Sequence, residues 1–282
     1  MGYRKPPETE RPGPTVRARP LHVERGTAVA RPDRLATEEP LEILVQHRGM
    51  QHNVAVTMRT PGNDFELATG FLYTEGMIAS RDDVAKVSYC ASGPPEQLYN
   101  VVTVELASRA PFDPERMKRN SYMTSSCGVC GKASLESVRV QCARLDDGPT
   151  VDVALIAALP DALRARQKVF DKTGGLHAAG SFDPSGSLIA VREDVGRHNA
   201  VDKLIGSALL NGTRGDIMMV SGRASFEIVQ KAAVARIPIV AAVSAPSSLA
   251  VSLAQELGMT LVGFIRGESF NIYAEPSRIR LA

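Results

Sequence analysis

The sequence predicts an α/β protein in which a smaller N-terminal α+β domain precedes the main domain. From residue 121 to residue 282, apolar runs typical of strands alternate with runs of helical spacing, and the connections are short. Between residues 21 and 120, short β-rich runs surround one helical pattern. At roughly 150 residues per domain, a chain of 282 residues suits two domains.

Residues 1–20 form a tail that is rich in proline and arginine. The tail has few apolar side chains, so burial cannot compensate for the entropy lost when the chain becomes ordered. We therefore expect this tail to be disordered.

The domain at residues 21–120 begins with a hairpin signal, because two β-rich runs flank Arg48-Gly49. Turn residues then lead into a helical pattern for which Asn63 or Asp64 is the expected N-cap. Two further β-rich runs follow, separated by glycine and proline. The expected strands are 41–45, 54–58, 84–90 and 98–106, and the expected helix is 64–78.

The domain at residues 121–282 repeats a strand–helix–strand pattern. Gly212 and Gly258 follow two of the helical runs, as expected at helix C-termini. Such repeats favour a mainly parallel sheet covered by helices, with ligands bound beyond the carboxyl ends of the strands. The expected strands are 188–191, 216–220, 238–243 and 260–265, and the expected helices are 199–210, 226–235 and 248–257.

Charge and cysteine content exclude several classes of protein. The chain has 33 Lys and Arg against 31 Asp and Glu, and residues 41–282 carry 25 of each sign. This balance argues against a nucleic-acid or polybasic membrane binder. The longest apolar stretch, 232–251, is interrupted by Arg236 and Pro238, so we expect no membrane span. Four cysteines are too few for a disulfide scaffold, so we expect a cytoplasmic protein with reduced thiols.

The strongest chemical signal is a pair of thiols, Cys127 and Cys130, in the sequence SSCGVCGK. A thiol in such a motif, near a cation, is more acidic than a free cysteine and is nucleophilic at neutral pH. Flanking glycines predict a mobile loop. One interpretation is a sulfur carrier, in which a thiolate accepts sulfur as a persulfide and presents it on this loop.

Three other interpretations of the pair remain open. A structural zinc site needs about four ligands, and a second C-x-x-C or an H-x₃₋₅-H is missing. A thioredoxin-type dithiol requires the motif at a helix start after a strand, whereas Cys127 follows a connector-like stretch. Two packed structural thiols are the simplest alternative, but buried cysteines prefer apolar neighbours, as Cys90 and Cys142 have.

Several glycine, histidine and arginine residues gather where strands are expected to end, and they resemble an anion site. Glycine turns expose backbone amides, and helix N-termini carry partial positive charge. Arg and His also bind phosphates and stack on planar rings. The candidate binding residues are Gly174, His177, Arg197, His198, Ser221, Arg223 and the segment Phe264, Ile265, Arg266, Gly267, Glu268 and Ser269. Neither G-x-x-x-x-G-K-[ST] nor a G-x-G-x-x-G after a strand is present, which disfavours an ordinary ATPase or NAD enzyme.

With these motifs in view, the chain resembles the FdhD/NarQ family of formate dehydrogenase accessory proteins. The similarity covers most of residues 40–275 and is specific at four motifs: SCGVCG at 126–131, GGLH at 174–177, EDVGRHNAVDK at 193–203 and SGRASFE at 221–227. The resemblance implies a cytoplasmic sulfurtransferase that carries sulfur from a cysteine desulfurase. Its acceptor would be the Mo-bis(molybdopterin guanine dinucleotide) cofactor, with molybdenum or tungsten, before insertion into formate dehydrogenase.

The same resemblance assigns roles to residues. The persulfide-bearing cysteine of the family corresponds to Cys127, with Cys130 as its motif partner, and the cofactor-contacting segment corresponds to residues 264–269. The molybdenum cofactor would be a bound substrate. Partners would be the desulfurase and formate dehydrogenase, without nucleic acid or membrane, and a homodimer is expected.

The resemblance also implies a cytidine-deaminase-like β/α sandwich for the larger domain. Deaminase chemistry needs zinc held by H-x-E and P-C-x-x-C motifs, but here His198 is followed by Asn199-Ala200 and the 221–225 turn has no cysteine. We therefore expect no metal bound directly by the protein. Two alternatives to the sulfur carrier stay open: a non-covalent cofactor chaperone and a metal-dependent nucleotide deaminase.

Overall fold

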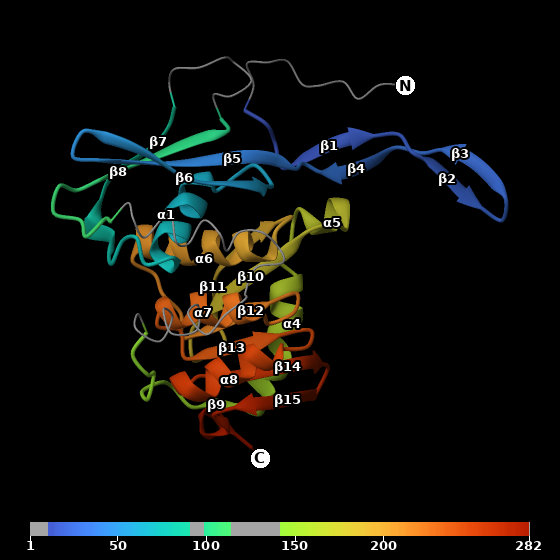
Figure 1. Cartoon of the computed structure of the whole chain (residues 1–282). Coiled ribbons are helices and arrows are strands. Elements are labelled where there is room, and N and C mark those ends of the chain that lie inside the picture. The colour runs from blue at the N-terminus through green and yellow to red at the C-terminus, as the bar shows by residue number, and fades with distance from the viewer. Residues whose placement is uncertain (1–10, 91–98, 114–141, 282) are drawn as a thin grey trace.

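The computed structural model describes residues 11–90, 99–113 and 142–281. It has a four-stranded sheet near the N-terminus, a six-stranded sheet in the C-terminal half, and helices packed on both (Figure 1). The predicted mixed α/β class is confirmed. The likeness to a cytidine-deaminase sandwich stays a prediction.

The four-stranded sheet has the order β6-β5-β8-β7. β5 (Glu39–His47) and β6 (Met50–Arg59) form the predicted hairpin, and its turn at Arg48 and Gly49 has positive φ at both residues. β8 (Val101–Leu106) runs parallel to β5, β7 (Val84–Tyr89) pairs with β8, and the 3-10 turn η1 (Arg81–Asp83) precedes β7.

α1 (Asp64–Thr74) covers this sheet and buries Leu67 and Leu72 against it. Asn63 is the N-cap position, but its backbone is left-handed and its side chain makes no capping bond. The helix ends at Thr74 rather than at the predicted residue 78, because Gly76 adopts a positive φ of 69°.

The residues before β5 form a projecting ribbon, which we call the N-terminal arm (residues 15–36). β1 (Thr15–Ala18) pairs with β4 (Asp33–Ala36), and β2 (Leu21–Glu24) pairs with β3 (Thr27–Ala30). Both pairs are antiparallel, and they extend away from the body of the molecule (Figure 1). The structure thus differs from the expected disordered tail at residues 15–18, where backbone pairing with residues 33–36 supplies partners that the composition did not reveal. Residues 1–10 lie outside the described residues.

The six-stranded sheet has the order β11-β10-β12-β13-β14-β15. Its strands are β10 (His177–Phe182), β11 (Leu188–Asp194), β12 (Ile217–Val220), β13 (Ile239–Ala242), β14 (Thr260–Arg266) and β15 (Ser269–Ala274). Only β12, β13 and β14 run parallel, so the expected mainly parallel sheet is wrong for this part of the chain. The reason is that β10–β11 and β14–β15 are hairpins, which are antiparallel by construction.

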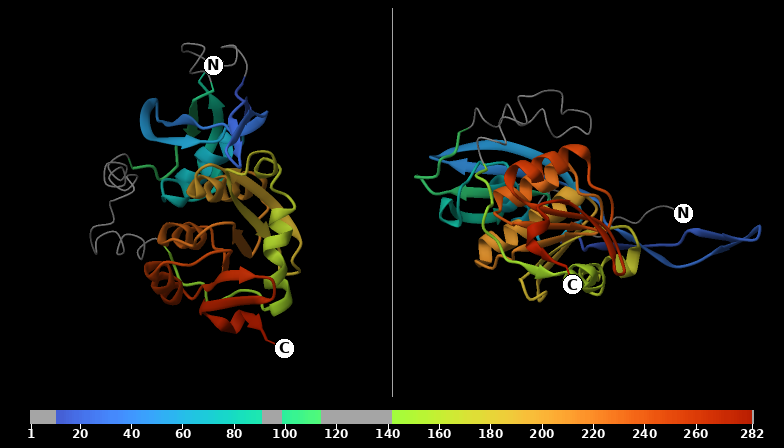
Figure 2. Two further views of the ribbon diagram at one scale, coloured as in Figure 1. Left: turned by 90° about the vertical axis from the view of Figure 1, so that its right-hand side faces the viewer. Right: turned by 90° about the horizontal axis from the view of Figure 1, so that it is seen from below.

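Helices cover both faces of this sheet (Figure 2). α6 (Arg197–Asn211), α7 (Phe226–Val234) and α8 (Ser248–Leu257) share one buried cluster, and α4 (Val153–Arg164) packs on the opposite face. Gly212 and Gly258 end α6 and α8 in the left-handed conformation, as predicted. The remaining elements are α5 (Phe170–Thr173), η4 (Pro276–Arg278) and the parallel pair β9 (Val151–Asp152) and β16 (Ile279–Arg280).

The two halves meet where α1 packs against α6. A Cβ added at Gly206 would lie 1.9 Å from the carbonyl oxygen of Glu66, and one added at Gly70 would lie 1.9 Å from that of Asp202. Only glycine allows the two backbones to approach so closely. The contact fixes the N-terminal sheet beside the first helix that follows β11.

Candidate anion-binding site

The candidate site lies at one edge of the six-stranded sheet. The parallel strands β12, β13 and β14 all end there, and the antiparallel strand β10 begins there. β11 also ends at this edge, because His177 pairs with Asp194. α6 starts three residues later at Arg197. The topology therefore brings together segments that lie up to 89 residues apart in the sequence, from His177 to Arg266.

His177 and Ser221 form the centre of this edge. The backbone N–H of Ala178 donates to Ser221 Oγ at 2.9 Å, and Ser221 N donates to the carbonyl of Ala178 at 2.9 Å. A Cβ added at Gly222 would lie 3.4 Å from His177 Nδ1, so the glycine backbone lies directly against the imidazole. The two hydrogen bonds between Ser221 and Ala178 thus hold the turn at Gly222 beside the His177 imidazole.

His198 lies between Ser225 and Glu227 at the start of α7. Its Nε2 is 3.3 Å from Ser225 Oγ and 3.7 Å from Glu227 Oε2. The hydrogen bond to His198 lowers the pKa of Glu227 to about 2, against the opposing effect of partial burial. Glu227 is therefore ionised at neutral pH, beside the His198 ring.

The pKa of His177 is lowered. Burial is the main cause, the neighbouring Arg197 and His198 lower it further, and Asp194 opposes them. Arg197 Nε is buried without a hydrogen-bond partner among the described residues. A guanidinium donor without a partner beside two histidines and a helix N-terminus suits an anionic ligand.

Backbone hydrogen bonds extend the edge from β12 towards β14. Ser244 N donates to Gly222 O at 3.3 Å, and Phe264 N donates to Ser244 O at 3.2 Å. Phe264 has a positive φ of 54° and an exposed ring. The predicted segment 264–269 therefore begins at this edge, next to the ends of its neighbouring strands.

A buried polar network holds the start of α6 in place. Lys203 Nζ lies 2.7 Å from Asp194 Oδ2 and donates to Thr60 O at 2.8 Å. Thr60 N and Gly196 N both donate to the Asp194 carboxylate, at 3.2 and 2.8 Å. Asn199 Nδ2 donates to Asp194 at 3.1 Å and to Met58 O at 2.8 Å. Because Met58 lies in β6 and Thr60 directly follows it, the N-terminal domain anchors the helix that carries Arg197 and His198.

The structure separates some of the predicted residues from this cluster. Ile265 is 2% exposed within the core under the sheet, so only its backbone is available to a ligand. Glu268 and Ser269 line a different hollow of about 650 Å³, which also contacts Val153. Gly174, at the end of α5, and Arg223 are exposed, and Arg266 ends β14 immediately before Gly267 in the turn to β15. Cys127 and Cys130 lie outside the described residues.

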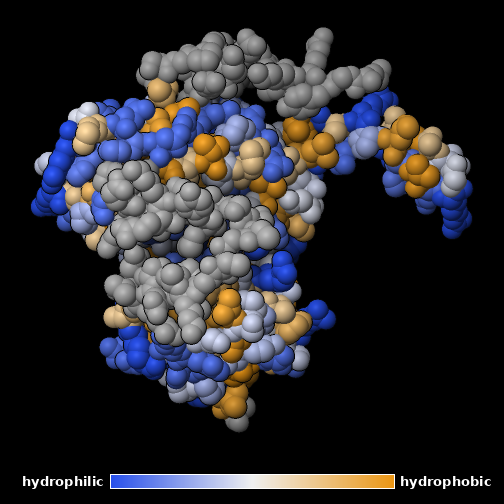
Figure 3. Space-filling view, viewed as in Figure 1, coloured by the Kyte–Doolittle hydropathy of each residue, from blue (hydrophilic) through white to orange (hydrophobic). Residues whose placement is uncertain are grey.

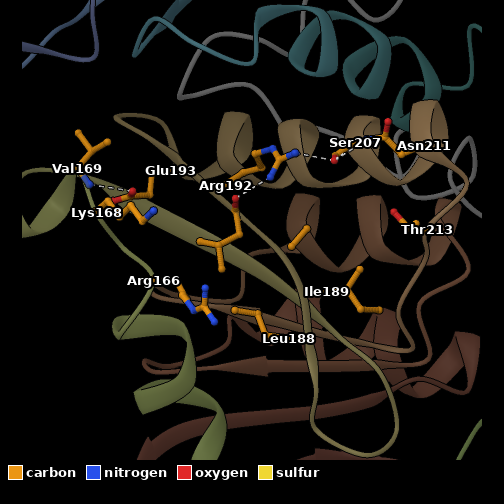
Figure 4. Close-up of a pocket in the computed structure, with 12 residues that line it drawn as sticks. Arg166, Lys168, Val169, Leu188, Ile189, Arg192, Glu193, Ser207, Asn211 and Thr213 are labelled. Carbon is orange, nitrogen blue, oxygen red and sulfur yellow. Dashed lines mark hydrogen bonds between the residues drawn. The ribbon is translucent and has the colours of Figure 1, made fainter.

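A second hollow, of about 600 Å³, follows the outer edge strand β11 (Figure 4). Arg192 donates to Ser207 Oγ at 2.7 Å and forms a bidentate ion pair with Glu66 of α1. Glu193 accepts the backbone N–H groups of Val169 and Phe170, at 3.0 and 2.7 Å. Arg192 and Glu193 of β11 therefore connect this strand to α1, α5 and α6, and they do not form a free charged surface.

Sequence reasoning missed several residues of the site. Ser225 and Glu227 were recognised only as part of a motif, although an acid in the first turn of a helix, after a serine, is a visible signal. Asp194, Asn199 and Lys203 were also missed as a network. The available signal for Asn199 and Lys203 was their position as polar residues in α6, nine of whose residues are buried, whereas Asp194 ends β11.

No helix in the described part of the chain is long and apolar enough to cross a membrane. Among residues 11–90, 99–113 and 142–281, no group of three or more His, Cys, Asp or Glu side chains is arranged to hold a metal ion. The expectation that the protein binds no metal directly stays a prediction.

Comparisons with known proteins agree with this architecture. The chain is 54% identical to "Sulfur carrier protein FdhD" of Mycolicibacterium paratuberculosis over 272 residues, which cover 94% of this chain and 98% of the relative. It is 52% identical to the protein of the same name from Streptomyces coelicolor, over 95% of this chain and 96% of the relative.

A solved structure is similar along almost its whole length. The crystal structure of a candidate formate dehydrogenase accessory protein from Desulfotalea psychrophila matches with a TM-score of 0.73 and 25% identity, covering 94% of this chain and 99% of that one. A model of the FdhD/NarQ family matches residues 36–280, which include every described residue of the sheet edge. The chain therefore belongs to the FdhD/NarQ family.

Proposed function

We propose that this protein is a sulfur carrier for the maturation of formate dehydrogenase. Relatives about half identical to it carry the name of a sulfur carrier, and the similar solved structure is of a candidate formate dehydrogenase accessory protein. In this proposal a cysteine desulfurase supplies the sulfur in the cytoplasm. The acceptor is the Mo-bis(molybdopterin guanine dinucleotide) cofactor, bound as a substrate by a homodimeric protein.

The observation that carries this proposal is the guanidinium donor at the sheet edge that has no partner among the described residues. Arg197 presents a buried donor without a partner, and His177 and His198 flank the N-terminus of α6, which has 15 residues. The acceptor cofactor carries pyrophosphate and guanine groups, and helix N-termini, Arg and His bind such groups. The chemistry of the residues present therefore fits the proposed substrate.

The covalent step is assigned to Cys127. Its thiolate attacks the outer sulfur of a desulfurase persulfide, the desulfurase cysteine leaves as a thiolate, and Cys127 becomes the persulfide. This exchange transfers one sulfur atom without an external oxidant or reductant. Cys130 is its motif partner in the proposal. The sheet edge binds and orients the acceptor, and Cys127 delivers the sulfur.

Cys127→Ala is expected to abolish this step. The wild-type protein, incubated with a cysteine desulfurase and cysteine, should gain about 32 Da by mass spectrometry as one persulfide sulfur. The Cys127→Ala protein should show no gain and should not restore formate dehydrogenase activity in cells that lack the native protein. Cys142→Ala is the control, because burial raises the pKa of the Cys142 thiol and so keeps it protonated. Full formate dehydrogenase activity with Cys127→Ala would refute the carrier mechanism. Cofactor binding is tested by a separate experiment.

Binding of GDP, a surrogate for half of the cofactor, should be strengthened by acid. The pKa of His177 is lowered, so this side chain is neutral at pH 8 and gains a proton only as the pH falls below its usual range near 6.5. Its positive charge then attracts the diphosphate. Titration calorimetry should show higher affinity at pH 6 than at pH 8. His177→Gln should reduce this pH dependence, and Arg197→Ala should weaken binding about tenfold at both pH values. Unchanged affinity in both variants would place the ligand elsewhere.

A further inference from the structure

The N-terminal arm is a pair of two-stranded ribbons with one face that is apolar near the tip. The β2–β3 register places Leu21 opposite Ala30 and Val23 opposite Ala28. Residues directly opposite in an antiparallel pair project from the same face. Leu21 is 70% exposed and Val23 is 64% exposed. Figure 3 shows apolar residues along the arm, which projects beyond the body of the molecule.

Such a ribbon gains little stability by itself. An isolated two-stranded hairpin is marginally stable in water, and three strands or a packed helix are normally needed. Among the described residues, β2 pairs only with β3, and β1 pairs only with β4. The apolar face of the tip therefore has no third strand from the described residues, and a partner that covers it would supply the missing burial.

The charges of the arm indicate the chemistry of that partner. Residues 15–36 contain five arginines against two acidic residues. The β1–β4 register places Arg17 directly opposite Arg34, and like charges in this position destabilise a sheet. Arg34 donates to Thr15 Oγ1 at 3.4 Å, which leaves its charge uncompensated by that contact. Acidic groups seated against the arm would relieve this repulsion.

The base of the arm leads to the candidate site. β4 lies against α5, which ends at Gly174, and His177 begins β10 three residues later. From residue 15 to residue 24, strands with a rise of about 3.3 Å per residue would extend about 30 Å. A partner held along the arm would thus be tethered beside the sheet edge.

We propose that the arm is a docking surface for an acidic, partly apolar surface of the formate dehydrogenase that receives the sulfur; this inference rests on the proposed function. A formate dehydrogenase with such a surface would cover Leu21 and Val23 and neutralise the charges of Arg17 and Arg34. A second copy of this chain pairing arm to arm is the less suitable occupant, because it would bring together two segments that each carry five arginines against two acidic residues. Nucleic acid would satisfy the arginines but would leave the apolar tip uncovered.

The test measures binding of the purified full-length protein to purified formate dehydrogenase without its cofactor. Leu21→Ser with Val23→Ser, and separately Arg17→Glu with Arg34→Glu, should each weaken binding by at least about tenfold. The matched controls are Leu249→Ser, at an exposed residue of α8, and Arg166→Glu, at an exposed residue after α4. The controls should bind as tightly as the wild type. Binding of the charge-reversed pair should also lose most of its salt dependence.

The outcomes separate the docking proposal from the proposed function. All variants should keep the wild-type melting temperature, GDP affinity and persulfide gain, which shows that the body is intact. If both arm variants bind formate dehydrogenase as the wild type does, the docking proposal is wrong, whatever the carrier activity. It is also wrong if the arm variants instead convert a dimer into a monomer by light scattering, or lose RNA binding alone. Loss of the persulfide gain in the wild type would instead refute the carrier function.

Discussion

Gly206→Ala should destabilise the protein by at least about 3 kcal/mol, at the upper end of what overpacking costs. In an isolated helix the same substitution would be favourable by up to about 1 kcal/mol, since alanine is the better helix former. Here the new methyl group would lie 1.9 Å from the carbonyl oxygen of Glu66. That oxygen belongs to the backbone of α1 and cannot rotate away, so the two helices must separate.

Thermal unfolding tests this expectation directly. A loss of about 3 kcal/mol corresponds to a fall of about 10 °C in the melting temperature for a protein of this size. Gly70→Ala should behave similarly, because its added methyl group meets the carbonyl of Asp202 at 1.9 Å. Gly13→Ala is the control, since nothing lies within 4 Å of a Cβ at that position. A fall of less than about 2 °C in both helix variants would show that α1 and α6 do not pack as closely as described.

Lys203→Met should cost about 3–5 kcal/mol, which is the usual effect of removing one partner of a buried ion pair. The Asp194 carboxylate is 0% exposed and would lose its cationic partner inside the protein, keeping only its N–H donors. The carbonyl of Thr60 would lose its donor as well. Because this network joins β6 to the start of α6, the variant should also bind GDP more weakly at a temperature where it is still folded.

A double-mutant cycle shows whether the pair is responsible. Asp194→Asn with Lys203→Met removes both charges and should recover part of the stability lost in Lys203→Met alone. Lys168→Met is the matched control at an exposed lysine. If Lys203→Met and Lys168→Met unfold at the same temperature, the Asp194–Lys203 pair does not contribute as the structure indicates.

Elements with strong local signals could be predicted from the sequence. β13 is a short apolar run with four fully buried residues, and α8 ends at Gly258. β10 was missed because its sequence, HAAGSF, consists largely of small residues with weak strand preference. Without β10 the order of the sheet could not be predicted, and its antiparallel pairings were therefore unexpected.

The candidate site was predictable where its residues follow strands or begin helices. Arg197, His198 and Ser221 follow from that rule, whereas His177 begins β10 and was noticed only in the GGLH motif; the topology brings all four to one edge. The supporting network was not predictable, because Thr60 is 134 residues from Asp194, to which its amide donates. Contacts of this kind depend on the packing of α1 against α6. The local sign of that packing is the pair Gly70 and Gly206, which the sequence does not distinguish from the other glycines of the chain.

The ion cluster at the helix junction has a consequence for how the molecule unfolds. Lys231 of α7 lies 2.9 Å from Asp202 of α6 and 3.1 Å from Glu75, which follows α1. Burial lowers the pKa of Lys231, but the Asp202 and Glu75 carboxylates outweigh it and raise the pKa overall. Lys231 and Asp202 both belong to the C-terminal half, so separating the two domains would take the Glu75 carboxylate away from Lys231 and the Thr74 hydroxyl away from Asp202. We therefore expect the two domains to unfold together.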